Sequence, residues 1–192
     1  EFMEPLRILQ LIDSLELGGA ERMAVNYANA LAARIECSAL VATRKEGPLK
    51  ETIHSGVHYL FLARKKTVDL GAVHRLYTFC KTHRITHLQP HSSSYFMACL
   101  VKMVLPSIQI IWHDHNGLSE FVSVKKLRML QLLSFWFTGI IAVNDRLKNW
   151  AVRELNCAQV IYLPNFVKAA PVATGVLLKG KEVKRIVCLA IL

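Results

Sequence analysis

Two histidines that stand one residue apart, His113 and His115, are the side chains of this sequence best placed for chemistry. They follow an apolar run, Gln109–Trp112, that predicts a buried strand, and open α/β sheets bind ligands at the carboxyl ends of their strands. Side chains alternate along a strand, so both rings point to one side if the strand continues through them. The pair then either contacts a ligand in a cleft or hydrogen-bonds to the loop that follows.

A metal site is the alternative use of these histidines. With His91 and Asp114 nearby, the His-x-His pair contains ligand types that zinc accepts. The sequence around them does not offer a further ligand at the spacing of a zinc site. We therefore expect no metal here.

A pair of glycines, Gly18 and Gly19, separates the first predicted strand from a helix whose apolar residues recur at spacings of three and four. Glycine lets the backbone turn tightly and approach a ligand, and a helix N-terminus offers free N–H groups to an anion. The two glycines either border a binding site or form a tight connection. Glu21 and Arg22 open the helix and either contact the ligand or cap the helix and face solvent.

Polar residues also follow two other predicted strands. His91 and Ser92 come after His87–Pro90 at the same expected edge of the sheet, where they either contact a ligand or cap the next helix. Asn144 comes after Ile140–Val143. We expect it to cap the helix that begins at Asp145, with a ligand contact as the alternative.

Strands and helices alternate along the chain, which predicts a mostly parallel sheet covered on both faces. We expect a doubly wound, Rossmann-like α/β domain of about seven strands with helices on both faces, spanning residues 3–167. Residues 168–182 are expected to form a linker, and residues 183–192 a first strand of a further domain. Six helices are expected at Ala20–Arg34, Leu49–Ser55, Leu70–His83, Tyr95–Leu105, Val122–Phe137 and Asp145–Leu155.

The composition is that of a globular protein with an excess of positive charge. The 192 residues are 53% hydrophobic and 20% charged, with a formal net charge of +10. The five cysteines are scattered without a C-x-x-C pair, which favours reduced thiols in a cytoplasmic protein. The basic residues lie outside any recognisable nucleic-acid module, so we expect no nucleic-acid partner. The run Arg64–Lys66 is expected to be a solvated loop.

A second basic group could face a membrane surface. Lys125, Lys126 and Arg128 stand among apolar residues on a predicted helix, and such a helix can lie on acidic lipid. Packing of its apolar residues in the core is the preferred interpretation. The least polar long stretch, Met129–Val143, falls short of the ~20 apolar residues that a spanning helix needs.

Four segments together resemble the family-4 retaining glycosyltransferases, which have the GT-B fold. The loop L-x-L-G-G-A-E-R of Leu15–Arg22 resembles the family's first glycine loop, and three later segments resemble family strands with the residues that follow them. These are Ile110–Gly117, which resembles a family strand that ends in His, Ile140–Asn144, and Val160–Val167 with its Pro-Asn pair. The matches occur in the family's order over residues 6–167.

The resemblance implies transfer of a sugar from a nucleotide-diphosphate sugar to an acceptor hydroxyl with retention, in cell-surface glycan or polysaccharide synthesis. The acceptor would be a glycan or a lipid-linked molecule, and no cofactor or metal is expected. The resemblance places His113 against the donor sugar, with His115 as the alternate, and Gly18 and Gly19 at the cleft. It also implies that these residues are the acceptor-side half of an enzyme, inactive alone, located in the cytoplasm or at the inner face of the membrane.

Other functions remain as alternatives. A nucleotide-sugar epimerase shares the two-domain architecture, although the glycine loop and the Pro-Asn segment favour the transferase. A basic membrane-docking or interaction domain would need no catalytic group at all. A nicotinamide-dependent dehydrogenase is disfavoured because the turn lacks the third glycine of G-x-G-x-x-G.

Overall fold

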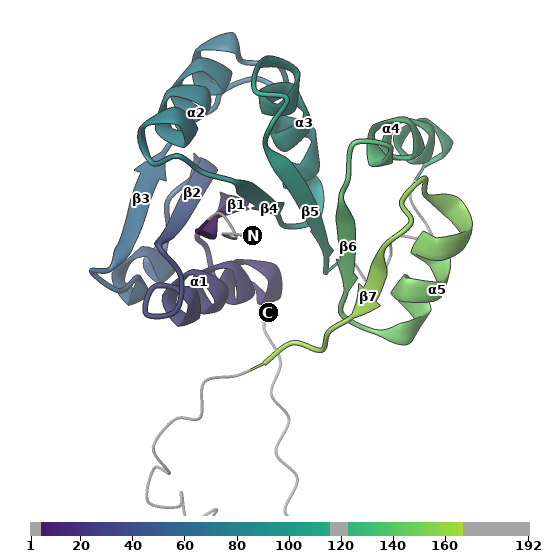
Figure 1. Ribbon diagram of the computed structural model, residues 1–192, viewed down its shortest axis with the longest axis horizontal. Coiled ribbons are helices and arrows are strands. Elements are labelled where there is room, and N and C mark those ends of the chain that lie inside the picture. Colours follow the sequence, from purple (N-terminus) through teal and green to yellow (C-terminus); the bar gives the residue numbers. More distant parts are fainter. Residues whose placement is uncertain (1–4, 116–122, 167–192) are drawn as a thin grey trace, which may run out of the picture.

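The computed structural model describes residues 5–115 and 123–166, in which seven parallel strands form one sheet in the order β3-β2-β1-β4-β5-β6-β7 (Figure 1). The expected linker at 168–182 and strand at 183–192 lie outside the described residues. The strands are β1 (Arg7–Ser14), β2 (Cys37–Lys45), β3 (Val57–Phe61), β4 (His87–Pro90), β5 (Gln109–Asp114), β6 (Gly139–Ala142) and β7 (Val160–Tyr162).

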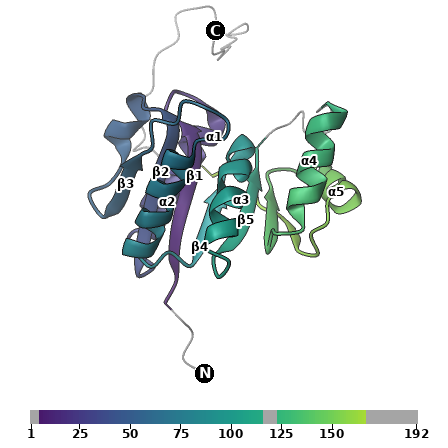
Figure 2. The same cartoon turned by 90° about the horizontal axis from the view of Figure 1, so that it is seen from above.

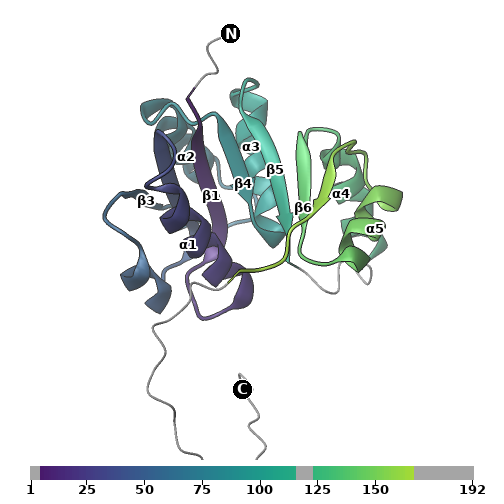
Figure 3. The ribbon, with the colours of Figure 1, turned by 60° about the horizontal axis from the view of Figure 1, so that its bottom comes forward.

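Helices cover both faces of the sheet, as predicted. Helix α1 (Gly19–Leu31) and the 3-10 turn η1 (Pro48–Thr52) lie on one face, where α1 stands in front of β1 (Figure 3). Figure 2 shows α2, α3 and α4 together on the opposite face. That face carries α2 (Leu70–Thr82), η2 (Ser92–Ser94), α3 (Tyr95–Val104), α4 (Val124–Ser134) and α5 (Asp145–Glu154).

Two hydrophobic cores result because neighbouring residues of each strand point to opposite faces. In β1, Leu9 and Leu11 belong to the core that residues of α2, α3 and α5 also enter, whereas Ile12 belongs to the core beneath α1. Gln10 points to the α1 face as well and is fully buried. A buried side chain of this polarity must find hydrogen-bond partners, because burying it without them costs on the order of 1–3 kcal/mol.

Most predicted elements are confirmed, although several bounds differ. Helix α1 ends at Leu31 rather than Arg34, and α4 ends at Ser134 rather than Phe137. The helix predicted at Leu49–Ser55 is the short 3-10 turn η1, which begins at Pro48 and ends before Ile53. Strand β1 is longer than its apolar run and continues to Ser14, which carries Asp13 to the edge of the sheet. The predicted cap is confirmed, because the Leu147 N–H donates to Asn144 Oδ1 at 2.8 Å.

Helix α4 packs through a narrow stripe. Its Leu130 is buried and Leu133 packs against the core, so the preferred interpretation of this helix holds for that stripe. Leu132 and Phe135, however, are 76% and 75% exposed, and the cations Lys125, Lys126 and Arg128 face solvent beside them. None of the helices in the described part of the chain has the length and apolarity to cross a bilayer.

Candidate functional site

The sheet has a switch point between β1 and β4. From β1 the chain proceeds to β2 and β3 on one side, with α1 on one face, and then returns through α2 on the other face to β4 on the opposite side of β1. The loops after β1 and β4 therefore leave in opposite directions, which opens a crevice at the carboxyl ends of these strands. Asp13 and Ser14 end β1 here, and His91 follows β4.

The three histidines predicted at this edge come together on the α1 face. His113 and His115 stack with ring centroids 4.0 Å apart, which confirms that both rings point to one side of the strand. His91 lies 5.0 Å from His113 and 5.1 Å from His115. We call His91, His113 and His115 the histidine cluster. Helix α1 covers it with Tyr27, whose ring stands edge-on to His113 at 5.3 Å.

Two buried glutamines join these rings into one hydrogen-bonded chain. His91 Nε2 lies 2.7 Å from Gln10 Oε1, Gln10 Nε2 donates to Gln89 Oε1 at 3.0 Å, and Gln89 Nε2 lies 3.1 Å from His113 Nδ1. On the other side His91 Nδ1 lies 2.8 Å from His115 Nε2. The motifs that reveal the histidines do not reveal Gln10 or Gln89; the one signal is a glutamine inside a run of apolar residues.

The two ends of this hydrogen-bonded chain differ, since one is a donor and the other an acceptor. With the two amides oriented as here, Gln89 donates to His113 Nδ1, so the neutral ring of His113 carries its proton on Nε2. His91 donates to Gln10 through Nε2 and accepts from His115, which leaves His115 Nδ1 without a proton. His113 Nε2 and His115 Nδ1 are the two buried nitrogens of these rings that lack a partner among the described residues. One end is therefore a donor and the other an acceptor.

Burial keeps all three rings neutral. It lowers the pKa of His113 to about 3 and, together with the neighbouring rings, lowers the pKa of His91 well below its usual range. Burial also lowers the pKa of His115 to about 4, although the Asn165 side chain nearby opposes this shift. A neutral imidazole ring has one donor and one acceptor nitrogen, which the hydrogen bonds between these rings and the two glutamines require.

The histidine cluster does not suit a metal ion while this chain is intact. Its ligand nitrogens lie within 4.8 Å of one another, which is close enough for one ion. Ligation by His91 Nδ1 and His113 Nε2 together would leave both rings donating into the two amides. Gln10 and Gln89 can accept from only one of the two rings, because an arrangement in which both amides accept from a ring turns their NH₂ groups toward each other. The donor set thus fits hydrogen bonding better than zinc.

A second group that could hold a metal lies at the other end of the strands. Cys37, His58 and His83 also bring their ligand atoms within 4.8 Å. The Arg7 guanidinium is next to this group, since it donates to the His83 carbonyl and interacts with Cys37. A fixed positive charge at this distance opposes a cation, and burial raises the pKa of the Cys37 thiol that would have to ionise.

On the opposite face of the same sheet edge, Asp13 organises a cluster of charged and hydroxyl groups. The Thr43 and Ser93 hydroxyls donate to its carboxylate at 2.6 and 2.7 Å, and Arg64 Nη2 donates at 3.1 Å. Ser94 lies at 3.4 Å, and Arg44 pairs with the second oxygen at 3.9 Å. We call Asp13, Thr43, Arg64, Ser93 and Ser94 the aspartate cluster.

The Arg64 side chain is buried, contrary to the expectation from the sequence. The run Arg64–Lys66 is not a solvated loop throughout, because the Arg64 side chain is only 4% exposed. Ala63, just before it, has φ 49°, a left-handed conformation that is costly for a residue with a Cβ. Ser92, just after His91, is in the same region with φ 48°. Such strained positions gather at functional sites.

Burial alone would raise the pKa of Asp13. The hydrogen bonds from Thr43 and Ser93 and the charges of Arg64 and Arg44 outweigh this effect, and the pKa is lowered. Asp13 is therefore ionised at neutral pH. The aspartate cluster is a network of full charges, in contrast to the neutral histidine cluster.

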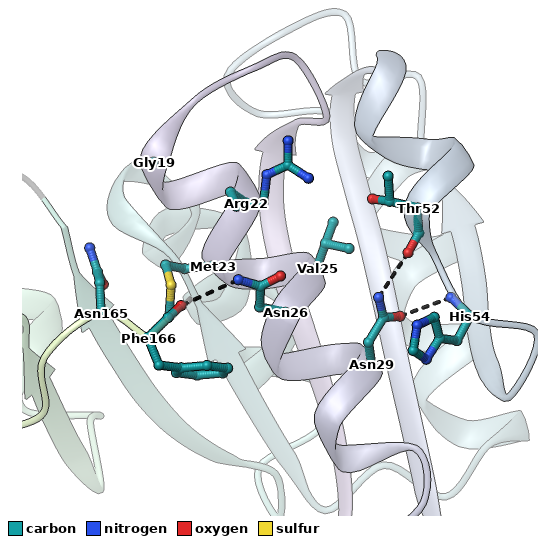
Figure 4. A pocket seen from close by; sticks show the side chains of 10 residues that line it. All are labelled: Gly19, Arg22, Met23, Val25, Asn26, Asn29, Thr52, His54, Asn165 and Phe166. Atoms are coloured by element: carbon teal, nitrogen blue, oxygen red, sulfur yellow. Dashed lines mark hydrogen bonds between the residues drawn. The ribbon is translucent and has the colours of Figure 1, made fainter. Parts of the chain in front are cut away.

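The glycine turn borders a cavity of about 510 Å³ beside α1 (Figure 4). Gly19 and Arg22 line it on one side, and Asn165 and Phe166 line it on the other. A Cβ on Gly19 would meet nothing within 4 Å, so packing does not require glycine there and the space is open to a ligand. Asn26 Nδ2 ties α1 to the Phe166 carbonyl at 3.4 Å.

The other predicted site residues have structural partners. The Glu21 carboxylate folds against Gly18, where a Cβ would collide with it, and occupies the first turn of α1. The Ser92 carbonyl accepts from Trp112 Nε1 at 2.8 Å. Asn144 caps α5 and lies at the end of β6, two strands away from the switch point.

The parallel sheet with helices on both faces, and the crevice at the carboxyl ends of β1 and β4, define a doubly wound α/β domain of the type that binds ligands at such a crevice. The family model for Glycosyltransferase Family 4 matches residues 17–170, so the chain belongs to this family. No curated protein matches the sequence.

Solved glycosyltransferases share the fold. The structure of Anabaena Alr3699/HepE in complex with UDP and glucose matches with a TM-score of 0.64 at 17% identity, over 83% of this chain and 44% of that one. A glycosyltransferase from Rickettsia africae matches with a TM-score of 0.65 at 8% identity, over 84% of this chain and 44% of that one. The chain thus spans about half the length of these two solved structures, and the matched part covers 44% of each.

Proposed function

We propose that this domain forms the acceptor side of an enzyme that moves a sugar from a nucleotide-diphosphate donor to an acceptor hydroxyl with retention of configuration. A second domain would bind the nucleotide, in keeping with the 44% of each matched glycosyltransferase that this chain covers. The UDP and glucose bound to the Anabaena protein support a nucleotide-sugar donor. The family match favours a transferase over an epimerase of similar architecture.

The observation that carries this proposal is the pair of unpartnered ring nitrogens at the ends of the histidine chain. A sugar hydroxyl is at once a donor and an acceptor, so it can complete both His113 Nε2 and His115 Nδ1. Preorganised hydrogen bonds of this kind act best in a water-poor site, where one such donor contributes about 3–4 kcal/mol to a transition state. The neutral rings avoid placing a positive charge beside an oxocarbenium-like centre.

The two histidines take different parts in this proposal. His115 is partly exposed although its Nδ1 is buried, so we place it nearer to the incoming sugar, and His113, which is fully enclosed, completes the contact from beneath. Gly19 and Arg22 border the route by which the donor diphosphate approaches the first turn of α1. No metal or cofactor is needed for this arrangement.

Location and membrane contact are part of the proposal. We place the enzyme in the cytoplasm, working in cell-surface glycan or polysaccharide synthesis at the inner face of the membrane. The exposed cations of α4, with Leu132 and Phe135 beside them, support peripheral contact with anionic lipid. Docking without catalysis is the rival, which a lipid-binding chain without transferase activity would favour.

The experiment measures release of nucleoside diphosphate from a panel of nucleotide sugars by a form of the protein as long as the matched glycosyltransferases. We expect release with one donor, and a loss of 10²–10³-fold in kcat for His115→Ala or His113→Ala. His74→Ala, an exposed histidine on α2, is the matched control and should keep full activity. Unchanged release in both site variants would remove the histidines from the mechanism, and no donor turnover or binding would overturn the transferase.

A further inference from the structure

A second cavity, of about 310 Å³, opens on the face of the sheet opposite to α1, next to the aspartate cluster. Its volume lies at the lower end of the range for small-molecule sites. Strand ends, η2, α3 and α4 all contribute to its wall. Three of the lining side chains are cations, namely Arg44, Arg64 and Lys126.

We propose that this cavity binds an anionic sugar, one that carries a phosphate or a carboxylate, as the acceptor of the transfer. The inference rests on the proposed function and adds to it the charge class of the acceptor. An anion on the acceptor would anchor it to the cations of the wall while its ring reaches the edge of the sheet where the histidine cluster lies.

The strongest observation is the incomplete partnering of Arg64. Its Nη2 donates to Asp13 and its Nη1 donates to the Thr67 carbonyl, both at 3.1 Å. Its Nε is buried and has no acceptor among the residues that the structure describes. A buried, charged donor without an acceptor is costly, and an anion in the adjoining cavity is the chemical group that would complete it.

Asp13 cannot fill this need. Its two oxygens already accept from two close hydroxyls and from Arg64, with Ser94 and Arg44 at longer range. Asp13 does not line the cavity itself, and Asp114 is the one carboxylate among the described lining residues, against the three cations. Arg44 and Lys126 are exposed, so both can swing toward a bound anion. The charge of the cavity wall is therefore positive in balance.

The rest of the wall suits a sugar ring. Tyr95, Phe96 and Trp112 line the cavity, and Tyr95 stands edge-on to Trp112 at 5.9 Å. Aromatic rings offer flat apolar surfaces to the C–H faces of a sugar, while Ser92 and Ser93 provide polar groups at the mouth. An inorganic ion alone would leave this aromatic surface unused.

The cavity also lies close to the histidine cluster along the chain. Ser92 and Ser93 line the cavity, and His91 immediately precedes them. The His91 ring bonds to Gln10 on the α1 face, whereas Ser93 donates to Asp13 on the opposite face, with the left-handed Ser92 between them. A molecule that fills the cavity and extends past η2 therefore reaches the edge where the proposed transfer takes place.

The test measures binding of four probes to this chain by calorimetry, without any nucleotide sugar: glucose 6-phosphate, glucuronate, glucose and inorganic phosphate. We expect at least one of the two anionic sugars to bind about tenfold or more tightly than glucose and inorganic phosphate, the gain of roughly one charge-assisted hydrogen bond. The two anionic probes separate phosphate from carboxylate. Equal binding of glucose, or of phosphate alone, would overturn the proposal.

Variants locate the site. Arg64→Lys keeps the charge beside Asp13 but removes the unpartnered Nε–H, and we expect it to weaken binding of the anionic sugar about tenfold. The double variant Arg44→Gln/Lys126→Gln changes exposed residues, so it tests the site even if Arg64→Lys unfolds. Lys81→Gln, an exposed cation at the end of α2, is the control. Unchanged binding in the double variant would overturn the proposal.

A negative result in this binding experiment is distinguishable from a negative result in the transferase experiment. Without a nucleotide sugar present, loss of binding in the cavity overturns the acceptor class and leaves nucleoside diphosphate release to be judged by itself. Conversely, tight binding of an anionic sugar by a protein that turns over no donor would overturn the transferase and keep the site.

Discussion

The histidine cluster and the aspartate cluster lie at the same edge of the same sheet, yet they are built from opposite kinds of polar group. Alternate residues of β1 produce both, because Gln10 points to the α1 face and Asp13 to the other. One cluster consists of neutral rings and amides, and the other of a carboxylate, guanidinium groups and hydroxyls. One strand thus carries both.

The difference lies in how each cluster tolerates burial. Neutral donors and acceptors can be fully buried if every group is paired, and the histidine chain leaves only its two ends open. Full charges must be compensated, so the aspartate cluster remains partly exposed and leaves one guanidinium donor unfilled. We therefore expect the first to recognise hydroxyl groups and the second an anion.

Acidification should give the largest difference between the two clusters, because it changes the contribution of the histidine cluster to the free energy of unfolding at a higher pH than that of the aspartate cluster. Between pH 6.5 and about pH 4 the unfolded chain takes up protons on its histidines that folded His113 and His115 refuse, so the free energy of unfolding falls as pH falls. Counting these two rings, we expect a loss of about 4.5 kcal/mol between pH 6.5 and pH 4.5. The pKa of Asp13 is lowered as well, so its stabilisation is also lost as pH falls, but only below its usual pKa of 3.8.

Urea unfolding at a series of pH values measures this loss. His115→Phe keeps an aromatic ring in the stack but cannot titrate, so its pH slope should be smaller by about 1.4 kcal/mol per pH unit. A free energy of unfolding that stays constant from pH 6.5 to pH 4.5 would mean that the rings are charged in the folded protein.

Removal of the central carboxylate should be the next largest effect. Asp13→Leu leaves Arg64 buried without its charged partner, and we expect a loss of about 3–5 kcal/mol in the free energy of unfolding. Glu36→Gln breaks the pair between Glu36 and Arg7, in which Glu36 is 56% exposed, and should cost less than about 1 kcal/mol. Similar losses in the two variants would show that Arg64 finds another partner.

Interruption of the histidine chain should cost less, because no charge is involved. Gln10→Leu leaves Gln89 and His91 each short of one hydrogen bond, with an expected loss of about 1–3 kcal/mol. The imidazole ¹⁵N shifts of His113 should also change, since its tautomer is no longer fixed through Gln89. Gln159→Leu, at an exposed position, is the control, and ring shifts that match the wild type would rule out the coupled chain.

The smallest effect concerns one hydroxyl of the aspartate cluster. Ser93→Ala removes the 2.7 Å hydrogen bond to Asp13, with an expected loss of about 1 kcal/mol and a rise in the pKa of Asp13. Thermal unfolding at neutral pH and NMR titration of the carboxylate measure the two quantities. Ser55→Ala, an exposed serine without this contact, should change neither.

How far the sequence predicts the molecule depends on the kind of signal. Apolar periodicity and turn residues predict the order of strands and helices, and short motifs predict the stacked pair His113 and His115 and the Asn144 cap. Single polar residues give no such pattern. Gln10, Gln89 and Arg64 are each surrounded in sequence by residues that suggest a plain strand or a solvated loop, and their partners are brought to them only by the sheet.

The hydrogen bonds of the histidine chain are all donated in one direction, and the opposite direction is a second arrangement of the same groups. Reversal requires Gln10 and Gln89 to rotate by half a turn inside a packed core while all three rings exchange their protonated nitrogens. Any halfway state sets two donors or two acceptors against each other. The chain thus has two states, and a ligand that favours one shifts their populations by its difference in affinity. A group bound at His115 can in this way determine whether His113 Nε2 donates or accepts a hydrogen bond, without any movement of the backbone.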